Sequence, residues 1–183
     1  MDKKLILISS IFFFICVFFI LNLSNQNKYN PQKNQLVLID RDKIHKIIIS
    51  AKDDAIELIK IDTLWSIAGN DSLTIKENYI NNFFEKIFQL NKKHLATSKE
   101  NNWITYGVNA EDGSHLAFIN NSGETMSYFV FGRSKNDFNS CYVRTQEETD
   151  VYLLDNNILH QLQTNINYWG ESISKPNNEE VIN

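Results

Sequence analysis

Hydrophobic residues fill one continuous stretch near the N-terminus and then give way to shorter, patterned segments. Residues 5–21 read LILISSIFFFICVFFIL and contain no charge, proline or glycine. A helix of this length spans about 26 Å, close to the hydrocarbon thickness of a bilayer. The stretch therefore predicts a transmembrane anchor over residues 5–23, preceded by a short N-terminus (1–4) and followed by a polar linker (24–34).

The charges beside this stretch favour one orientation. Lys3 and Lys4 precede it directly, whereas Lys28 and Lys33 follow at a distance. Positive charge concentrates on the cytoplasmic side of membrane helices. We expect a cytoplasmic N-terminus, a single pass through a bacterial inner (cytoplasmic) membrane, and an extracytoplasmic C-terminal domain.

The end of the apolar stretch favours an anchor that is not cleaved. A secretory signal peptide ends in a small-residue cleavage site, whereas this stretch runs into Phe18–Leu23. A lipoprotein would need a cysteine preceded by small residues, but Cys16 follows Phe13–Ile15. Cleavage stays open, and the anchor is the better interpretation.

Beyond the linker, short apolar runs separated by turn residues predict strands. In the first half these runs are Gln35–Ile39, Lys43–Ser50, Ala55–Ile61 and Leu64–Ile67. In the second half they are His115–Ile119, Met126–Phe131, Ser140–Thr145 and Val151–Leu154. Because the connections are short, these strands predict antiparallel β-meanders.

Two segments change to a helical period. The first carries an apolar stripe with i, i+3, i+4 spacing and predicts a helix over residues 75–91, formed by Ile80, Phe83, Phe84, Ile87 and Phe88. Thr74 and Glu77 have the spacing of a capping box at its start. The second stripe predicts a helix that ends near residues 168–170 and contains Ile158, Leu159, Leu162 and Ile166.

These elements predict an α+β fold: an N-terminal transmembrane helix plus antiparallel β-meanders packed with two amphipathic helices. The extracytoplasmic domain covers residues 35–170, and the polar residues 171–183 form a disordered tail. Each half contains several strands followed by a helix, about residues 36–91 and 115–168. A duplicated β-rich/helix unit is therefore one interpretation, although the halves share no residue-level identity.

Composition narrows the function. The formal net charge is −4, and no basic run exceeds Lys92-Lys93. Nucleic-acid affinity comes largely from lysine and arginine that neutralise phosphates, so we expect no nucleic-acid partner. Cys141 is the one cysteine outside the anchor, and its strand-like context favours a buried apolar residue over a nucleophile.

No catalytic signature stands out along the chain. Glycine loops for phosphate, Gly-x-Ser-x-Gly and His-Glu-x-x-His are absent, and the four histidines are scattered. Carboxylate pairs such as Asp53-Asp54 and Glu111-Asp112 fall in predicted turns, where Asp suits the backbone. Arg133 and Arg144 flank one loop and could form an anion site, but ordinary cross-strand pairing is the better interpretation. We predict no catalytic residue, no cofactor and no metal ion.

The order of the short motifs resembles a known family. An Ile-rich strand, Ile56–Lys60 and Leu64–Ile67 precede the first helix; Tyr106–Val108, Phe131-Gly132, Tyr142–Arg144 and Val151–Leu154 follow it. This order resembles an uncharacterised bacterial domain family, known as a domain of unknown function. Its members follow an N-terminal membrane helix and are often encoded beside gliding-motility-type ABC transporter components. The resemblance covers about residues 40–169, and many members carry further copies of the domain.

The resemblance implies a membrane-tethered accessory domain rather than an enzyme, because the family offers no catalytic residues to carry over. The residues that match its motifs are Trp65, Tyr106, Gly107, Gly132, Tyr142 and Arg144. We interpret most of them as packing and turn residues. Gly107 and Gly132 would supply turns, and Trp65 would bury a large area over the first helix.

Three functions follow from these observations. The first is a membrane-anchored extracytoplasmic interaction module with a membrane or envelope protein partner, as accessory to an ABC-type export or surface-assembly system. The second is a lipid- or glycan-binding envelope module, and the third is an envelope enzyme whose groups meet only in the fold. A buried Cys141 would remove the best candidate nucleophile of the third.

Overall fold

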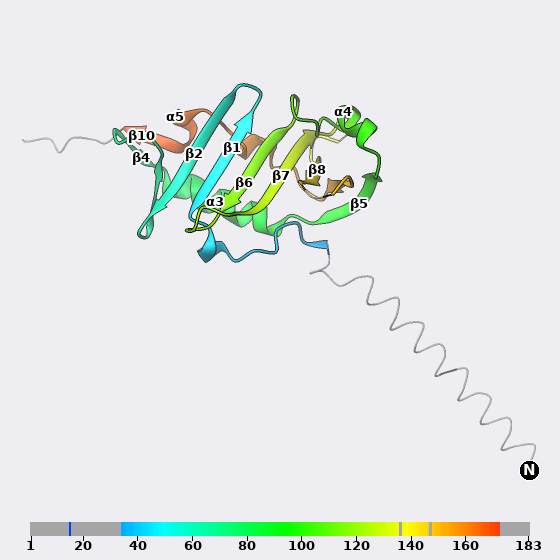
Figure 1. Ribbon diagram of the computed structural model, residues 1–183, viewed down its shortest axis with the longest axis horizontal. Helices are drawn as coiled ribbons and strands as arrows, with labels where there is room; N and C mark the ends of the chain where they lie inside the picture. The colour runs from blue at the N-terminus through cyan, green and yellow to red at the C-terminus, as the bar shows by residue number, and fades with distance from the viewer. Residues whose placement is uncertain (1–14, 16–33, 136, 147, 173–183) are drawn as a thin grey trace, which may run out of the picture. The chain divides into compact units, whose positions relative to one another are not determined.

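The computed structural model describes Ile15 and residues 34–135, 137–146 and 148–172 (Figure 1). The compact unit of the chain begins at Gln35. Apart from Ile15, the predicted anchor (5–23) lies outside the described residues, as does the chain beyond Ser172. Within the described part of the chain, no helix is long and apolar enough to cross a membrane.

A large antiparallel sheet and a few helices make up this unit, which confirms the α+β class. The sheet has the strand order β3-β2-β1-β6-β7-β8-β9-β5, and β10 and β4 form a separate pair. The strands are β1 (Lys46–Ala51), β2 (Asp54–Ile61), β3 (Leu64–Ile67), β4 (Leu73–Ile75), β5 (Lys92–Thr97), β6 (Ser114–Ile119), β7 (Thr125–Arg133), β8 (Cys141–Thr145), β9 (Val151–Leu154) and β10 (Gly170–Ser172). The helices are η2 (Arg41–Lys43), α3 (Glu77–Gln89), η3 (Glu100–Asn102), α4 (Trp103–Tyr106), η4 (Leu159–Gln161) and α5 (Ile166–Trp169).

The pairing of strands follows the same plan in the two halves. The meanders β1-β2-β3 and β6-β7-β8 lie on either side of the central β1–β6 pair. The next strand of each half then pairs with the last strand of the other half, β4 with β10 and β9 with β5. The halves differ at one place: β9 pairs with β8, whereas β4 does not pair with β3.

Helix α3 forms as its sequence predicts and covers one face of the sheet. Its buried residues are Ile80, Phe83, Phe84 and Ile87. They join a continuous core with the inward residues of the central strands, among them Ile47, Leu58 and Phe118. Trp169 is fully buried at the edge of this core, where its ring meets Phe83 at a centroid distance of 5.7 Å.

The opposite face of the sheet carries a smaller apolar cluster. Val130 in β7 and Val151 in β9 alternate with residues of the main core, so their side chains lie on the other face. The short α4 and the segment after it supply Trp103, Tyr106 and Val108 to this cluster. Figure 1 shows α4 near β8 and β5, at the opposite end of the sheet from β4 and β10.

The prediction of a second amphipathic helix is wrong. Residues 158–169 form two single turns, η4 and α5, instead of one continuous helix. Asn157 accepts a hydrogen bond from the Leu159 amide, and Asn165 accepts one from the Asn167 amide. Side chains that satisfy amides locally start short turns and compete with a regular helix. The apolar residues still reach the core, because each turn buries its own part of the stripe.

The strand predicted over residues 35–39 is also wrong. Only an isolated bridge joins Gln35 to Asn91, and the Leu36 amide donates to the Leu90 carbonyl at 2.9 Å. Leu36 and Val37 are nevertheless buried in the main core. This segment hydrogen-bonds to the residues just after the C-terminal end of α3 and does not join the sheet as a strand.

The start of α3 differs from the predicted capping box. Thr74 lies in β4, and the helix begins at Glu77 with Lys76 at its cap and no side-chain cap bond. The Lys76 amide donates instead to the Trp169 carbonyl at 2.7 Å. At the other end of the chain, Glu171 and Ser172 pair with β4 as part of β10, so the ordered domain reaches past residue 170.

Candidate functional site

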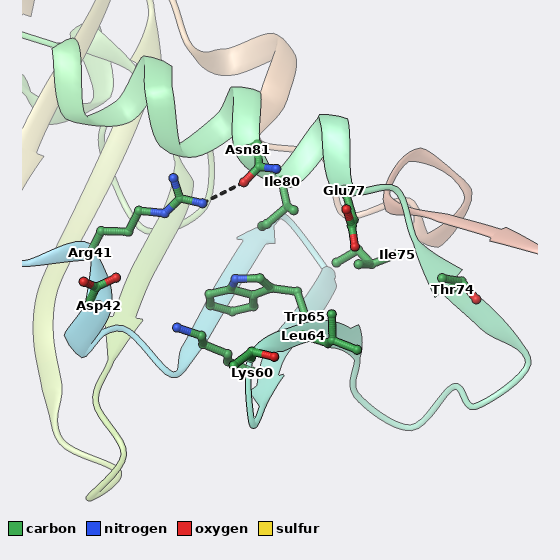
Figure 2. Close-up of a pocket in the computed structure, with 11 residues that line it drawn as sticks. Arg41, Asp42, Lys60, Leu64, Trp65, Thr74, Ile75, Glu77, Ile80 and Asn81 are labelled. Carbon is green, nitrogen blue, oxygen red and sulfur yellow. Dashed lines mark hydrogen bonds between the residues drawn. The ribbon is translucent and has the colours of Figure 1, made fainter.

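A pocket lies where β2, β3, β4, α3 and η2 come together. Its volume is about 410 Å³. The residues that line it are Arg41, Asp42, Lys60, Thr63, Leu64, Trp65, Thr74, Ile75, Glu77, Ile80 and Asn81. Figure 2 shows the Trp65 ring in the middle of the group, with α3 on one side of it and Lys60 on the other. The pocket therefore combines one large aromatic ring with polar groups from several elements.

Trp65 owes its place to the β2–β3 hairpin. It lies opposite Lys60 in the antiparallel register, so both side chains lie on the face that α3 covers. Its ring packs against the Phe84 ring of α3, with the two centroids 5.4 Å apart. This is the contact with the first helix that the sequence predicts. The side chain is only half-buried, so part of the ring is available to a ligand.

Arg41 closes one side of the pocket and is held in place. Its Nη2 donates to Asn81 Oδ1 at 2.7 Å, and its guanidinium lies 4.4 Å from the centroid of the Phe84 ring. A cation over an aromatic face gains electrostatic energy from the ring quadrupole. These two contacts orient Arg41 against the rim of α3.

The charges around the pocket are divided between its two sides. Arg41, Asp42 and Lys60 lie on one side of Trp65 in Figure 2, and Glu77 lies on the other. Ion pairs among the described residues join Lys46 to Glu57 and Lys92 to Glu148, and none involves Lys60, Asp42 or Glu77. One side of the pocket therefore carries net positive charge and the other negative charge.

The other residues of the family motifs gather on the opposite face, around α4. Tyr106 and Tyr142 meet edge to face with ring centroids 4.7 Å apart. Gly107 ends α4 in the left-handed conformation (φ +64°), which agrees with its expected role in a turn. Gly132 lies inside β7 rather than in a turn; an added Cβ would be 2.0 Å from the Tyr106 carbonyl oxygen.

Arg144 links β8 to this cluster. Its Nε donates to the Val108 carbonyl at 2.7 Å, and its guanidinium lies 3.9 Å from the centroid of the Trp103 ring. Burial lowers the pKa of the Arg144 guanidinium below its ordinary value. Through these two contacts, Arg144 fixes α4 and the segment after it to the sheet.

Comparison with family models places these motifs in one family. A model described as Domain of unknown function (DUF4340) matches residues 65–179, more than half of the chain. The chain belongs to this family. The DUF4340 match begins at Trp65 in the pocket and includes every motif residue around α4. Comparisons with curated proteins and with solved structures gave no match.

Cys141 is not available as a nucleophile in this DUF4340 domain. Its side chain is fully buried, and its Sγ donates to the Asn156 carbonyl at 3.5 Å. Burial raises the pKa of the Cys141 thiol to about 11. A thiol of this kind is almost entirely protonated at neutral pH.

The remaining candidates for chemistry do not converge. The register places Arg144 opposite Val130 and Arg133 opposite Cys141, which puts the two arginines on opposite faces of the sheet and rules out an anion site made of both. His115 is engaged at both ring nitrogens, by the Tyr128 hydroxyl and the Ala110 carbonyl. Within the described ranges, no group of three or more His, Cys, Asp or Glu could hold a metal ion.

The sequence predicts Trp65 as a residue that packs on the first helix, and it predicts no pocket around it. Arg41, Lys60, Glu77 and Asn81 belong to three different elements and have no common spacing.

Proposed function

We propose that this DUF4340 chain is a membrane-anchored extracytoplasmic interaction module that binds a membrane or envelope protein. In this proposal it serves an ABC-type export or surface-assembly system as an accessory and has no catalytic role. The single observation that carries the proposal is the pocket beside β3, which presents a half-buried aromatic ring, exposed apolar side chains and unpaired charges at one end of the sheet.

The composition of this surface favours a protein partner. Leu64 and Ile61 pair across the β2–β3 hairpin, beside the Lys60–Trp65 pair but on the opposite face of the hairpin, and are 65% and 57% exposed. Interface centres are enriched in large aromatic and apolar side chains, with charged groups around them. Trp65 and the neighbouring charges of Lys60 and Glu77 reproduce this arrangement on a small scale.

The anchor supports the location. The apolar residues 5–23 would hold the domain beside the membrane, and the lysines before them favour export of the domain. A domain confined to a membrane surface meets a partner in the same membrane at high effective concentration. A weak contact surface is then sufficient.

A non-catalytic role is supported by the state of the reactive groups. The best candidate nucleophile, Cys141, is buried and has a raised pKa. The histidine with the most developed contacts, His115, already has a partner at each ring nitrogen. An envelope enzyme would need a nucleophile or an acid–base pair in an accessible cleft.

A glycan-binding envelope module is the second candidate. It is favoured by the Trp65 ring, which has the hydrogen-bonding groups of Asn81 and Glu77 near it in the same pocket. A flat aromatic ring with polar groups at its edge can hold the apolar face of a sugar. The protein partner remains the better proposal because the exposed apolar residues extend outside the pocket.

We also propose that the domain is a duplicated unit. The reciprocal pairings of β4 with β10 and β9 with β5 support this origin, as do the two three-stranded meanders about β1 and β6. In the second half, the turns η4 and α5 take the place of α3.

Site-specific photo-crosslinking in intact membranes tests the proposed function. A photoreactive amino acid replaces Leu64 at the β3 edge, Leu95 at the other end of the sheet, or Ile104 on α4, all of which are exposed. We expect at least one site to capture a membrane or envelope protein, identified by mass spectrometry and confirmed by a reciprocal crosslink from that protein. Failure of all three sites to capture such a protein would overturn the proposal.

A further inference from the structure

The outer edge of β3 has an unpaired backbone at Trp65. The Lys60 amide donates to the His45 carbonyl, so the backbone of Lys60 points toward β1 and away from β3. Trp65 lies directly opposite Lys60 in the register. In an antiparallel ladder, the backbone groups of such a non-hydrogen-bonded pair point away from each other. The N–H and C=O of Trp65 therefore point out of the sheet, where no backbone partner lies within the described residues.

The corresponding position in the second half is closed. There β8 pairs with β9, and β9 continues the sheet to β5. In the first half β4 follows β3 through a short turn but pairs only with β10. The pocket is lined by Leu64 and Trp65 of β3 and by Thr74 and Ile75 of β4, so it occupies the split between these two strands. The second half shows that a strand beside this position completes the sheet.

The sequence and pairing of β3 add little protection against strand addition. Proteins protect edge strands by keeping them short, by covering them, or with lysine, proline and bulges. β3 is short, and β4 and α3 leave its edge open only at the split, so any added strand must enter there. The four residues of β3 are Leu-Trp-Ser-Ile, with regular pairing to β2 and no charge. Leu64 at its start is largely exposed. An edge of this composition is a template for a further strand.

We propose that an extended segment of a partner protein binds in the split between β3 and β4 and pairs its backbone with that of Trp65. An apolar side chain of the segment lies on the Trp65 ring. A carboxylate two residues away lies beside Lys60, on the side of the pocket where positive charge exceeds negative. This proposal deepens the proposed function and rests on it, because it names the part of the partner that is bound.

A single extended segment fits this site better than a second copy of the chain. β4 and α3 both line the pocket, so the edge of β3 is accessible only through the split. A second copy would bring its own β3 with β2 and α3 attached, and these elements would meet β4. Pairing through a strand as short as β3 also buries far less than the ~800 Å² per partner of a standard interface.

Hydrogen–deuterium exchange of the full chain in detergent micelles tests the pairing. The probe is a synthetic, capped peptide in which glutamate and leucine are separated by one threonine within a run of threonines. Two further peptides carry N-methyl groups on alternate amides, one in each of the two registers. We expect the parent peptide to slow exchange in residues 62–68 at least several-fold, and only one of the two methylated peptides to do the same. Strand pairing uses only every second amide of the added segment.

Charge variants test the position of the carboxylate. Lys60→Glu should weaken binding of the parent peptide about fivefold and should improve binding of a peptide with lysine in place of glutamate. Lys93→Glu makes the same charge change on the exposed β5 and should leave both affinities unchanged. Unaltered exchange in α3 verifies that each variant is folded.

Each of the other outcomes overturns the inference. Equal effects of the two methylated peptides, or binding without protection of residues 62–68, would mean that the pocket holds side chains and not a strand. Protection that grows with protein concentration alone would mean that the occupant is a second copy. Protection by a soluble oligosaccharide but by no peptide would mean that the site holds a glycan. If the peptide fails while Leu95 or Ile104 crosslinks to a membrane protein, the proposed function stands and only this inference falls.

Discussion

Gly132 of β7 lies against the carbonyl oxygen of Tyr106, so closely that a Cβ at Gly132 would be 2.0 Å from that oxygen. This contact brings α4 onto the face of the sheet opposite α3. It also explains why the motif residues Tyr106, Gly107 and Gly132 belong together, although 25 positions separate Gly107 from Gly132 in the sequence. The three residues meet in one packing contact between α4 and β7.

Gly132→Ala should therefore destabilise the domain. The added methyl group meets backbone atoms that cannot move independently, and overpacking of this kind costs about 3 kcal/mol. Gly123→Ala is the control, because Gly123 has φ +84° with nothing within 4 Å of an added Cβ, and the left-handed backbone alone costs about 1 kcal/mol. Urea unfolding followed by near-UV circular dichroism measures both. Equal midpoints for the two variants would contradict the contact.

Arg144→Met should cost about 2 kcal/mol. The variant keeps much of the side-chain length but removes the hydrogen bond to the Val108 carbonyl and the contact with the Trp103 ring. Arg133→Met, on an exposed residue of β7, should change the unfolding free energy by less than ~0.5 kcal/mol. A loss of partner binding by Arg144→Met without loss of stability would instead assign Arg144 to a binding surface.

Because of Cys141, the free energy of unfolding should decrease at alkaline pH. Its pKa is about 11 in the folded protein, against an ordinary value of 9.0. The unfolded state therefore releases the thiol proton first, and stability falls as pH rises from about 9 to 11, by about 2–3 kcal/mol in total. Cys141→Ala should remove this part of the pH dependence. Unfolding curves at pH 8 and pH 10.5 measure it, and parallel behaviour of the two proteins would contradict the burial of the thiol.

Trp65 and Trp169 should respond differently to truncation. Trp169 is fully buried and donates from its indole nitrogen to the Gln163 carbonyl at 2.7 Å, so Trp169→Ala should cost about 4 kcal/mol. Trp65 is half-buried at the pocket, and Trp65→Ala should cost about 1–2 kcal/mol. Thermal unfolding of both variants tests this order. A reversed order would mean that Trp65 serves the core and not a ligand.

Local pattern is sufficient where an element buries a regular stripe. The sequence predicts helix α3 because its apolar residues recur with the helical period, and it predicts the meander strands because β-branched runs alternate with turn residues. The second helix fails, since Asn157 and Asn165 satisfy nearby amides and divide an otherwise helical stripe. The sequence does not predict strand β5, because Lys92-Lys93-His94 has low strand propensity. The strand forms because it pairs with β9.

The pocket depends on long-range geometry that no local pattern contains. It arises because β4 pairs with β10, nearly 100 residues away in the sequence, and so leaves β3. Arg41 reaches the pocket from the segment before β1 because Asn81 and Phe84 hold it against α3. Lys60, Leu64 and Trp65 belong to short motifs in the sequence, but nothing in those motifs indicates that they line a pocket.

We propose that residues 5–23 hold a folded domain outside the cytosol, and labelling of engineered cysteines in spheroplasts tests this topology. In a chain that carries Cys16→Ser and Cys141→Ala, one variant adds Asn121→Cys in the exposed β6–β7 turn and another adds Lys3→Cys before the anchor. We predict that a membrane-impermeant maleimide labels Asn121→Cys in intact spheroplasts and labels Lys3→Cys only after permeabilisation. Labelling of Asn121→Cys only after permeabilisation would mean that the domain lies in the cytosol.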